Sequence, residues 1–372
     1  MKMLQLEECC EILDSMRVPI TAKDRKKGPY PYYGANGVQD YVADYIFDDD
    51  LVLLAEDGGN FGSDKRPIAY KVSGKCWVNN HAHVLKPKAD MDVDYLCYSL
   101  MFYKVDGMVN GATRMKLTQA AMRRMLIPSR TIEGQKAVVR LLNRIQMLIK
   151  VEKEQLKKYD ELIKSRFVEM FGDPVKNENA WNTIPLEDAC ISIVDCPHST
   201  PHYTFENTGY MCIRTSMVKK NRILWDEIEY IPEAEYFQRI KRRKPQKGDV
   251  IYTREGAILG IAAVIDRECD VALGQRSMLL SPDTSVCLPE FLSTAMNFDS
   301  FLNKVLEGVS GSASPHINVG DIRIYNIMMP PIKLQSTFAA FVREIDKLRF
   351  VTQKSLAETQ QLFDSLMQKY FG

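Results

Sequence analysis

Three short basic runs have the composition that binds phosphate groups. They read KDRKK at 23–27, KKNR at 219–222 and KRRK at 241–244. Lysine and arginine neutralise nucleic-acid phosphates and release counterions, so these runs favour contact with a nucleic-acid backbone; the alternative for any single run is a solvated face. The 372-residue chain has a net charge of only +1. It therefore concentrates its basic residues locally, unlike a protein that coats polyanions in bulk.

Side chains suited to reading bases lie near the basic runs. In the DNA major groove arginine pairs with guanine, and asparagine or glutamine with adenine, whereas lysine and tyrosine contact phosphates. The segment YPYYGANG at 30–37 suits a loop that faces DNA, and the alternative is an Asn-Gly hairpin turn with packing tyrosines. The DNA-contacting residues predicted in the first half are Lys26, Lys27, Tyr30, Tyr32, Tyr33, Asn36, Lys65, Arg66 and Arg114. Those predicted in the second half are His202, Tyr203, Arg214, Thr215, Lys219, Lys220, Arg222, Arg254, Arg276 and His316.

The sequence lacks the common signatures of catalysis. There is no GxxxxGK[ST], no HExxH and no Asn-Pro-Pro-aromatic motif. His81 and His83 have the alternation of strand residues, which more often pack than bind metal, and EDGGNFG at 56–62 is better read as a tight turn than as a phosphate cradle. Cys196 and His198 lack a third orienting group. We therefore expect no catalytic residue, metal site or cofactor in this chain.

Two long helices are the clearest predicted elements. Apolar residues recur at steps of three and four after Glu133 and after Thr337, and a breaking proline precedes each helix. This pattern predicts a coiled-coil seam, and the predicted seam residues are Leu142, Ile145, Ile149, Leu156, Ile163, Val342, Ile345, Leu356 and Phe363. The segments between the helices are rich in β-branched and aromatic residues broken by glycine turns, so they are predicted to be strands.

The chain repeats itself at an offset of 200 residues. The repeat pairs apolar helix positions without a gap, and both copies end in Phe-Gly. Examples are Arg123 and Arg323, Gln135 and Gln335, Ile145 and Ile345, Leu148 and Leu348, Val151 and Val351, Leu162 and Leu362, and Phe171 and Phe371. An internal duplication of this kind predicts two equivalent modules. The expected divisions are globular domains at 1–128 and 173–328, each followed by a helical spacer, at 129–172 and 329–372.

The order of these segments resembles the specificity subunits of type I restriction-modification systems. The resemblance covers essentially the whole chain, and its most telling pieces are VNNHAHVLKP, KPQKGDVIYTREGAILGIAAVI and VSGSASPHINVGDIRIYNIMMPPIKLQ. The first repeat departs from it with IPSRTIEGQ in place of a Pro-Pro turn. The resemblance implies an α+β fold, in which two β-rich target-recognition domains are joined by two long antiparallel coiled-coil helices in a pseudo-twofold internal repeat.

The same resemblance implies the function and the partners. Each domain reads one half of a split target in double-stranded DNA, while the helices set the gap and dock methyltransferase (M) subunits, two of them expected. Restriction (R) subunits complete the complex. S-adenosylmethionine, ATP and Mg are expected on these partner subunits only, and the chain is expected to be non-catalytic by itself.

The sequence leaves two rival classes open and gives an expectation for localisation. One rival is a two-domain protein-binding scaffold on a coiled coil, which salt-sensitive DNA binding would separate. The other is a hydrolase with an unrecognised site.

The start of the chain lacks a signal peptide pattern, no apolar run is long enough to cross a membrane, and nine scattered cysteines suit a reducing compartment. We expect the bacterial or archaeal cytoplasm.

Overall fold

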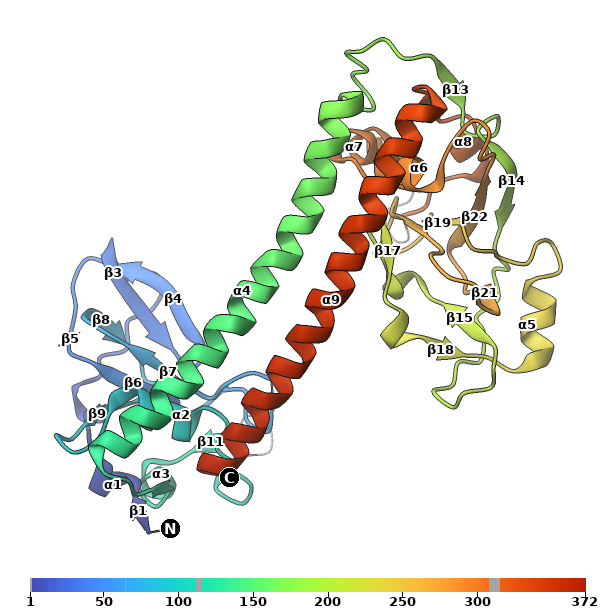
Figure 1. Ribbon diagram of the computed structural model, residues 1–372. Coiled ribbons are helices and arrows are strands. Elements are labelled where there is room, and N and C mark those ends of the chain that lie inside the picture. The colour runs from blue at the N-terminus through green and yellow to red at the C-terminus, as the bar shows by residue number, and fades with distance from the viewer. Residues whose placement is uncertain (1, 64, 112–114, 308–314) are drawn as a thin grey trace. The chain divides into compact units, whose positions relative to one another are not determined.

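The computed structural model describes residues 2–63, 65–111, 115–307 and 315–372 (Figure 1). The chain divides into two compact units. Unit 1 comprises Met1–Lys153 and Lys354–Gly372, and unit 2 comprises Glu154–Gln353. Each unit therefore contains one β-rich module and one half of each long helix. Within the described ranges, no helix has the length and apolar character needed to span a membrane.

Unit 1 is built on two four-stranded sheets. The main sheet has the antiparallel order β2-β9-β6-β7, from Cys10–Ile12, Ala82–Pro87, Leu51–Ala55 and Ala69–Val72. The second has the order β4-β3-β8-β5, from Gly37–Val42, Lys27–Gly34, Lys75–Val78 and Phe47–Asp48, and its β3–β8 pair is parallel. The remaining elements are β1 (Met3–Gln5) with β12 (Leu126–Pro128), β10 (Val109–Asn110) with β11 (Lys116–Leu117), the α-helices α1 (Leu6–Cys9), α2 (Val93–Met101) and α3 (Gln119–Arg123), and the 3-10 helix η1 (Asp14–Met16).

Unit 2 repeats this plan. Its main sheet has the antiparallel order β14-β22-β19-β20, from Cys190–Asp195, Ser277–Pro282, Val250–Thr253 and Ala262–Val264. The second has the order β18-β15-β21, from Glu229–Tyr230, Met211–Ile213 and Val271–Leu273, and β15–β21 is parallel. The remaining elements are β13 (Thr183–Pro185) with β23 (Asn326–Met328), β16 (Val218–Lys219) with β17 (Arg222–Ile223), the α-helices α5 (Glu233–Arg239), α6 (Pro289–Met296), α7 (Asp299–Glu307) and α8 (Val319–Arg323), and the 3-10 helices η2 (Thr215–Met217) and η3 (Trp225–Glu227).

The local sequence explains the central strands and a helix start. β6 reads LVLLA and β19 reads VIYT, and every residue of both is buried. A strand covered on both faces is apolar throughout and does not alternate. α2 begins after Asp92, whose carboxylate accepts the main-chain N–H groups of Asp94 and Tyr95, as an N-cap residue does.

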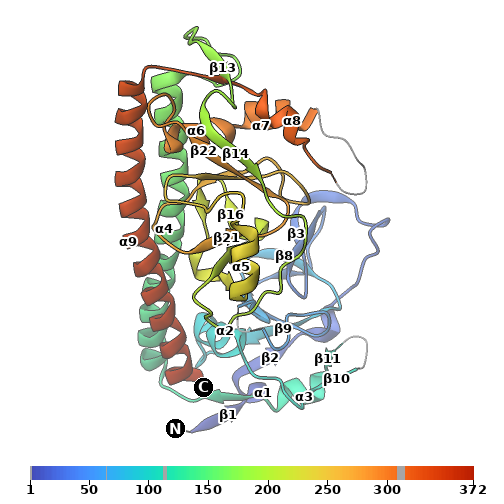
Figure 2. The ribbon, with the colours of Figure 1, turned by 90° about the vertical axis from the view of Figure 1, so that its right-hand side faces the viewer.

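The two long helices are α4 (Ile132–Phe171) and α9 (Ile332–Phe371), each of 40 residues. Figures 1 and 2 both draw them side by side. In unit 1 the start of α4 packs against the end of α9, with Leu142 and Phe363 in one core. In unit 2 the end of α4 packs against the start of α9, with Ile163 and Val342 in one core. The helices are therefore antiparallel in each unit, and the α+β fold with an internal repeat is confirmed.

The Phe-Gly ending of α4 has a packing role. Phe171 is fully buried, and its ring centroid lies 5.0 Å from that of Phe291 and 5.5 Å from that of Phe338. Gly172 has φ +81°, a left-handed conformation that favours glycine, and its N–H bonds to Val168 O at 2.9 Å. The pair thus closes the helix and fills the core of unit 2.

Candidate nucleic-acid interface

The main sheets of the two units share one register. In unit 1, Val52 on β6 pairs with Leu85 on β9. In unit 2, Val250 on β19 pairs with Leu280 on β22. The carbonyl of the residue after each central strand accepts a hydrogen bond from a segment further along the chain. In unit 1, Leu117 N–H donates to Glu56 O at 2.7 Å. The corresponding donor in unit 2 is Ile317 N–H, which lies 2.8 Å from the carbonyl of the residue after β19.

This register identifies equivalent polar positions. The equivalent pairs are Asp14 and Asp195, Glu56 and Arg254, Asp57 and Glu255, His81 and Arg276, His83 and Met278, and Lys116 and His316. The framework is the same in both units, but most of the side chains placed on it differ.

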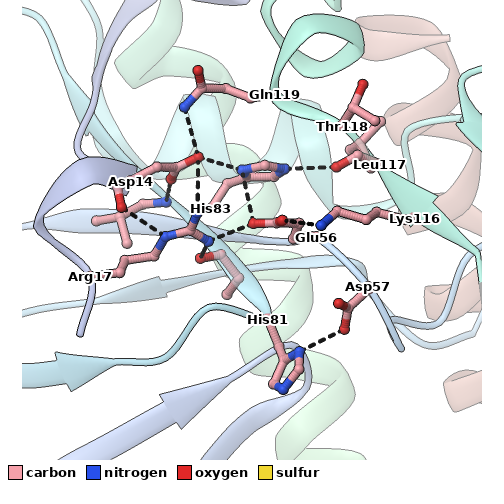
Figure 3. A network of polar contacts seen from close by, with 12 residues as sticks. Asp14, Arg17, Glu56, Asp57, His81, His83, Lys116, Leu117, Thr118 and Gln119 are labelled. Atoms are coloured by element: carbon pink, nitrogen blue, oxygen red, sulfur yellow. Dashed lines mark hydrogen bonds and ion pairs between the residues drawn. The ribbon is translucent and has the colours of Figure 1, made fainter. Parts of the chain in front are cut away.

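A buried network occupies these positions in unit 1 (Figure 3). His83 is 1% exposed, with Nδ1 2.6 Å from Asp14 Oδ2 and Nε2 2.9 Å from Leu117 O. Both ring nitrogens therefore face oxygen atoms, one of a carboxylate and one of a main-chain carbonyl. His83 thereby fastens β11 to η1 and β9.

The acids of the network are matched by basic partners. Glu56 lies 2.6 Å from Arg17 and 2.9 Å from Lys116. Burial raises the pKa of the Asp14 carboxyl, but hydrogen bonds from His83, the Val84 main chain and Gln119 outweigh burial and leave that pKa below its usual value. The pKa of Glu56 is also lowered, because contacts with Lys116 and Arg17 outweigh the effect of burial.

The same network contains the arrangement that most resembles a metal site. One donor atom from each of Asp14, Glu56 and His83 lies within 4.8 Å of the others. Arg17 already contacts both carboxylates, 3.5 Å from Asp14 and 2.6 Å from Glu56. A positive charge is therefore built into the site, and we assign the group a structural role.

A polar edge borders this network on the surface of unit 1. Asn36, at the tip of the β3–β4 hairpin, donates to Gly58 O at 3.0 Å and accepts from Asn60 at 3.2 Å. His81 Nδ1 lies 2.7 Å from Asp57 (Figure 3). The exposed side chains of Lys65 and Arg66 follow the turn, and both main-chain N–H groups donate to Ser63.

The structure places the hairpin residues differently from one another. Lys26 and Lys27 are exposed, Tyr30 packs on Tyr45 at 5.0 Å and Tyr33 packs on Tyr70 at 5.9 Å between ring centroids. Tyr32 is a correction to the predicted set, because it is 1% exposed and its hydroxyl accepts from Ile20 N at 3.1 Å. Its side chain belongs to the interior. Arg114 lies outside the described residues.

In unit 2 the equivalent network is simpler. Arg254 is 6% exposed, and it binds Asp195 through Nε at 2.8 Å and through a terminal nitrogen at 3.1 Å. His198 Nε2 lies 3.2 Å from the same carboxylate. Arg254 is a second correction, because a guanidinium held inside by a bidentate carboxylate is not presented to DNA.

Two predicted residues of unit 2, Tyr203 and Arg214, contact each other, and the others have separate neighbours. Arg214 lies over the Tyr203 ring at 4.6 Å and binds Glu229 at 2.9 Å. His202 is exposed and its ring contacts Glu235. Thr215 is the first residue of η2, and Arg276 is exposed between β21 and β22. The main chain of His316 forms an antiparallel β-bridge with that of Glu255.

The KKNR run has a different set of neighbours. Lys219 donates to Ser216 O at 2.8 Å, and Arg222 is half-buried. Lys220 lies 2.8 Å from Asp299, which also binds Lys164 of α4 at 2.7 Å. These two lysines hold the pKa of Asp299 down to about 2. Part of the run thus fastens β16–β17 to α4 and α7.

The predicted seam residues lie along the packed faces of the helices. Leu142, Ile145, Ile149 and Phe363 are buried in unit 1, and Ile163, Val342 and Ile345 are buried in unit 2. Leu356 and Leu156 are partly buried against the same two cores.

Other apolar residues of α4 and α9 are exposed at repeated positions. Leu148 and Leu348 are 54% and 52% exposed, and Val151 and Val351 are 44% and 64% exposed. These exposed apolar positions recur at the offset of 200 residues that relates the two helices.

Sequence reasoning missed the Asp14–His83 network and the turn residues Asn80 and Gln275. The only available signal was the unequal segments VNNHA and ALGQR at equivalent places. Side-chain partners in the network are far apart in sequence, so spacing alone does not pair them.

Comparison with known proteins identifies the family to which this chain belongs. The profile of the type I restriction modification DNA specificity domain matches residues 1–159 and 180–360. The chain therefore belongs to this family, with two such domains, and it is a DNA specificity protein of the type I restriction-modification class.

Individual relatives agree over most of their length. A putative type I restriction enzyme specificity subunit of Haemophilus influenzae is 24% identical over 351 residues, covering 92% of this chain and 87% of the relative. The crystal structure of a type I restriction-modification S subunit from M. genitalium is 12% identical, with a TM-score of 0.62 over 100% of this chain and 96% of that chain. A structure from work on assembly and conformational transition of the type I R-M system is 16% identical, with a TM-score of 0.53 over 100% of this chain and 97% of that chain. The two solved structures share the fold with this chain.

Proposed function

We propose that each unit reads one half of a bipartite sequence in double-stranded DNA. The observation that carries the proposal is the shared register of the two main sheets, which presents different polar side chains at equivalent positions, such as His81 in unit 1 and Arg276 in unit 2. One scaffold with two sets of side chains suits two different half-sequences, because bases are distinguished by the donors and acceptors they meet.

The long helices are proposed to set the unread gap. α4 and α9 each run without a break through 40 residues, which corresponds to about 60 Å at 1.5 Å per residue. A helical element of this length is stiff enough to act as a spacer between two readers, whose half-sites on DNA recur at roughly 34–36 Å per turn.

The exposed apolar pairs on these helices are proposed as docks for two methyltransferase subunits. The pairs Leu148 with Val151 and Leu348 with Val351 repeat the same spacing on the two helices. Replacing Leu148 and Val151 with Arg and Glu is expected to remove one methyltransferase subunit from the complex, and replacing the second pair to remove the other. Native mass spectrometry would report this stoichiometry. Two subunits retained by a chain altered at both pairs would refute these docks.

The chemistry is proposed to lie on the partner subunits. S-adenosylmethionine would bind the methyltransferase subunits, and ATP and Mg the restriction subunits, in the cytoplasm of a bacterium or archaeon. The purified chain is then expected to show no methyl transfer or cleavage by itself.

The decisive experiment is to sequence DNA from cells that express this chain with its methyltransferase partner. The expected result is one methylated motif made of two specific halves and an unread gap. Methylation of a single continuous sequence would contradict reading in two halves. A chain without salt-sensitive DNA binding would favour the protein-binding scaffold.

A further inference from the structure

Arg276 stands on a strained turn of unit 2. It has φ +72°, a left-handed conformation that costs a residue with a side chain free energy. The turn is held from several sides, since Arg276 O accepts from Arg254 N at 3.1 Å and Gly274 N–H donates to Ile213 O at 2.9 Å. Arg254 is itself fixed by Asp195 at 2.8 Å. The framework thus forces one exposed residue into an unfavourable conformation.

The strain brings the Arg276 side chain over a glycine. A Cβ built on Gly256 would lie 3.4 Å from a terminal nitrogen of Arg276 and 3.6 Å from its Cδ. Gly256 has φ +91°, a conformation that glycine adopts freely, so the unfavourable backbone at this place is that of Arg276. Unusual backbone of this kind gathers at sites that bind ligands.

The guanidinium of Arg276 is also unengaged. It makes no hydrogen bond or ion pair with any residue in the described ranges, and the side chain is exposed. Its basic neighbours are different, because Arg214 binds Glu229 at 2.9 Å and His202 contacts Glu235. A guanidinium presents five donors in a planar fork that fits two adjacent acceptors. Arg214 and His202 have acidic partners within the chain, so of these three basic side chains Arg276 is the one offered to a partner from outside.

The equivalent turn of unit 1 carries other base-reading types. Asn80 is exposed, and His81 is oriented by Asp57 at 2.7 Å (Figure 3). In unit 2 the neighbour of Arg276 is Gln275, whose Oε1 accepts from Thr200 at 2.8 Å. The same turn therefore presents an amide beside a ring in one unit and an amide beside a guanidinium in the other.

We propose that Arg276 is a specificity-determining residue that binds the O6 and N7 acceptors of a guanine in the half-site read by unit 2. The inference rests on the proposed function, because it assigns one base of the proposed bipartite target. Arginine bound to these two acceptors is the commonest specific contact in the major groove. The main-chain hydrogen bonds of the turn fix the point from which the side chain leaves the backbone, and a fixed origin suits a contact with one particular base.

The test uses the complex of the full chain with its methyltransferase partner and a DNA library randomised in each half-site. The informative variant is Arg276→Gly, since glycine adopts a positive φ without strain and the variant should fold at least as well. Arg267→Ala is the matched control, because Arg267 is 52% exposed in the same unit and pairs with Asp266.

With Arg276→Gly, the preference for guanine at one base pair is expected to fall by about 5-fold to 150-fold. The other half-site and the salt dependence should stay as in the unaltered chain, and Arg267→Ala should change neither. A retained motif would overturn the inference and leave the proposed function intact. Uniformly weaker binding with a smaller salt slope would overturn it too, by making Arg276 a phosphate contact. An unaltered chain that selects no bipartite sequence would refute the proposed function and this inference with it.

Discussion

Gln135 and Gln335 make the same three hydrogen bonds at positions 200 residues apart. Gln135 accepts from Asp92 N and donates to Asp90 O and Arg130 O. Gln335 accepts from Leu288 N and donates to Val286 O and Pro330 O. Both side chains are buried near the start of a long helix. Each glutamine therefore ties a spacer helix to the segment before a short helix of its own unit.

Replacing either glutamine with alanine should destabilise the chain. The substitution removes three hydrogen bonds to main-chain groups that are mostly part-buried and open to water, so the expected total cost is that of about one unsatisfied group, roughly 1–3 kcal/mol. The free energy of unfolding, measured with denaturant, should fall by about that amount in each single variant. The two losses should add, because the glutamines share no partner. Gln353→Ala, at an exposed position of α9, is the control and should have little effect. Wild-type stability in both single variants would contradict the role given to these residues.

The two lysine clusters should differ in their effect on DNA binding. Replacing Lys26 and Lys27 with alanine removes two exposed cations, so the slope of log affinity against log salt should fall by about 1.8. Replacing Lys219, Lys220 and Arg222 should also weaken binding and flatten the slope. The change per residue should be smaller, because Lys220 is already paired with Asp299 at 2.8 Å. Binding titrations at several salt concentrations give both slopes. An unchanged slope would remove the altered cluster from the interface.

Lengthening both helices by one heptad should widen the gap in the target. Seven residues inserted after Lys153 and seven after Gln353 fall where each helix passes from one unit to the other. They add about 10 Å, or roughly three base-pair steps of 3.4 Å. A heptad nearly preserves the facing of the seam, with a drift of about 20°. The methylated motif should keep both half-sequences with about three more unread base pairs. An active variant with the original gap would show that the helices do not set the spacing.

Acid should weaken unit 1 through its buried network. The pKa values of Asp14 and Glu56 are lowered in the folded chain. Groups with a lowered pKa stabilise the fold above their unfolded pKa, near 3.9 for Asp and 4.3 for Glu, and this contribution is lost as pH falls through the folded pKa. Asp14→Asn should destabilise the chain at pH 7 and reduce the loss of stability below about pH 4. Unfolding curves from pH 7 to pH 3 test this, and an unchanged pH dependence would count against the network.

The fold was largely predictable from the sequence, and the individual contacts were not. The repeated apolar steps place the spacers at 129–172 and 329–372, and the helices span Ile132–Phe171 and Ile332–Phe371. Apolar periodicity is a local property of the sequence, so it predicts a helix even when the residues that pack against the helix are not known. The sequence does not reveal that Arg254 pairs with Asp195, because the two residues lie 59 positions apart. Tyr32 and Tyr33 point to opposite faces of β3, and the sequence does not show which of these faces is covered. The predicted DNA contact of Tyr32 is wrong for this reason. The remaining DNA-contacting residues stay predictions.

The equivalent positions Glu56 and Arg254 carry opposite charges, and this difference limits how such chains can be recombined. A chimaera that joined β6 and its following residue to the β14 region would bring Glu56 against Asp195 without Arg17 and His83, which contact the carboxylates of both Glu56 and Asp14 in unit 1. The reciprocal chimaera would set Arg254 beside Arg17 and Lys116. Crossovers in α4 and α9 meet matched apolar residues instead. Genetic exchange would therefore preserve folding when it moves a recognition domain whole, with its breakpoints in the helices, and each domain would be inherited as an indivisible unit of specificity.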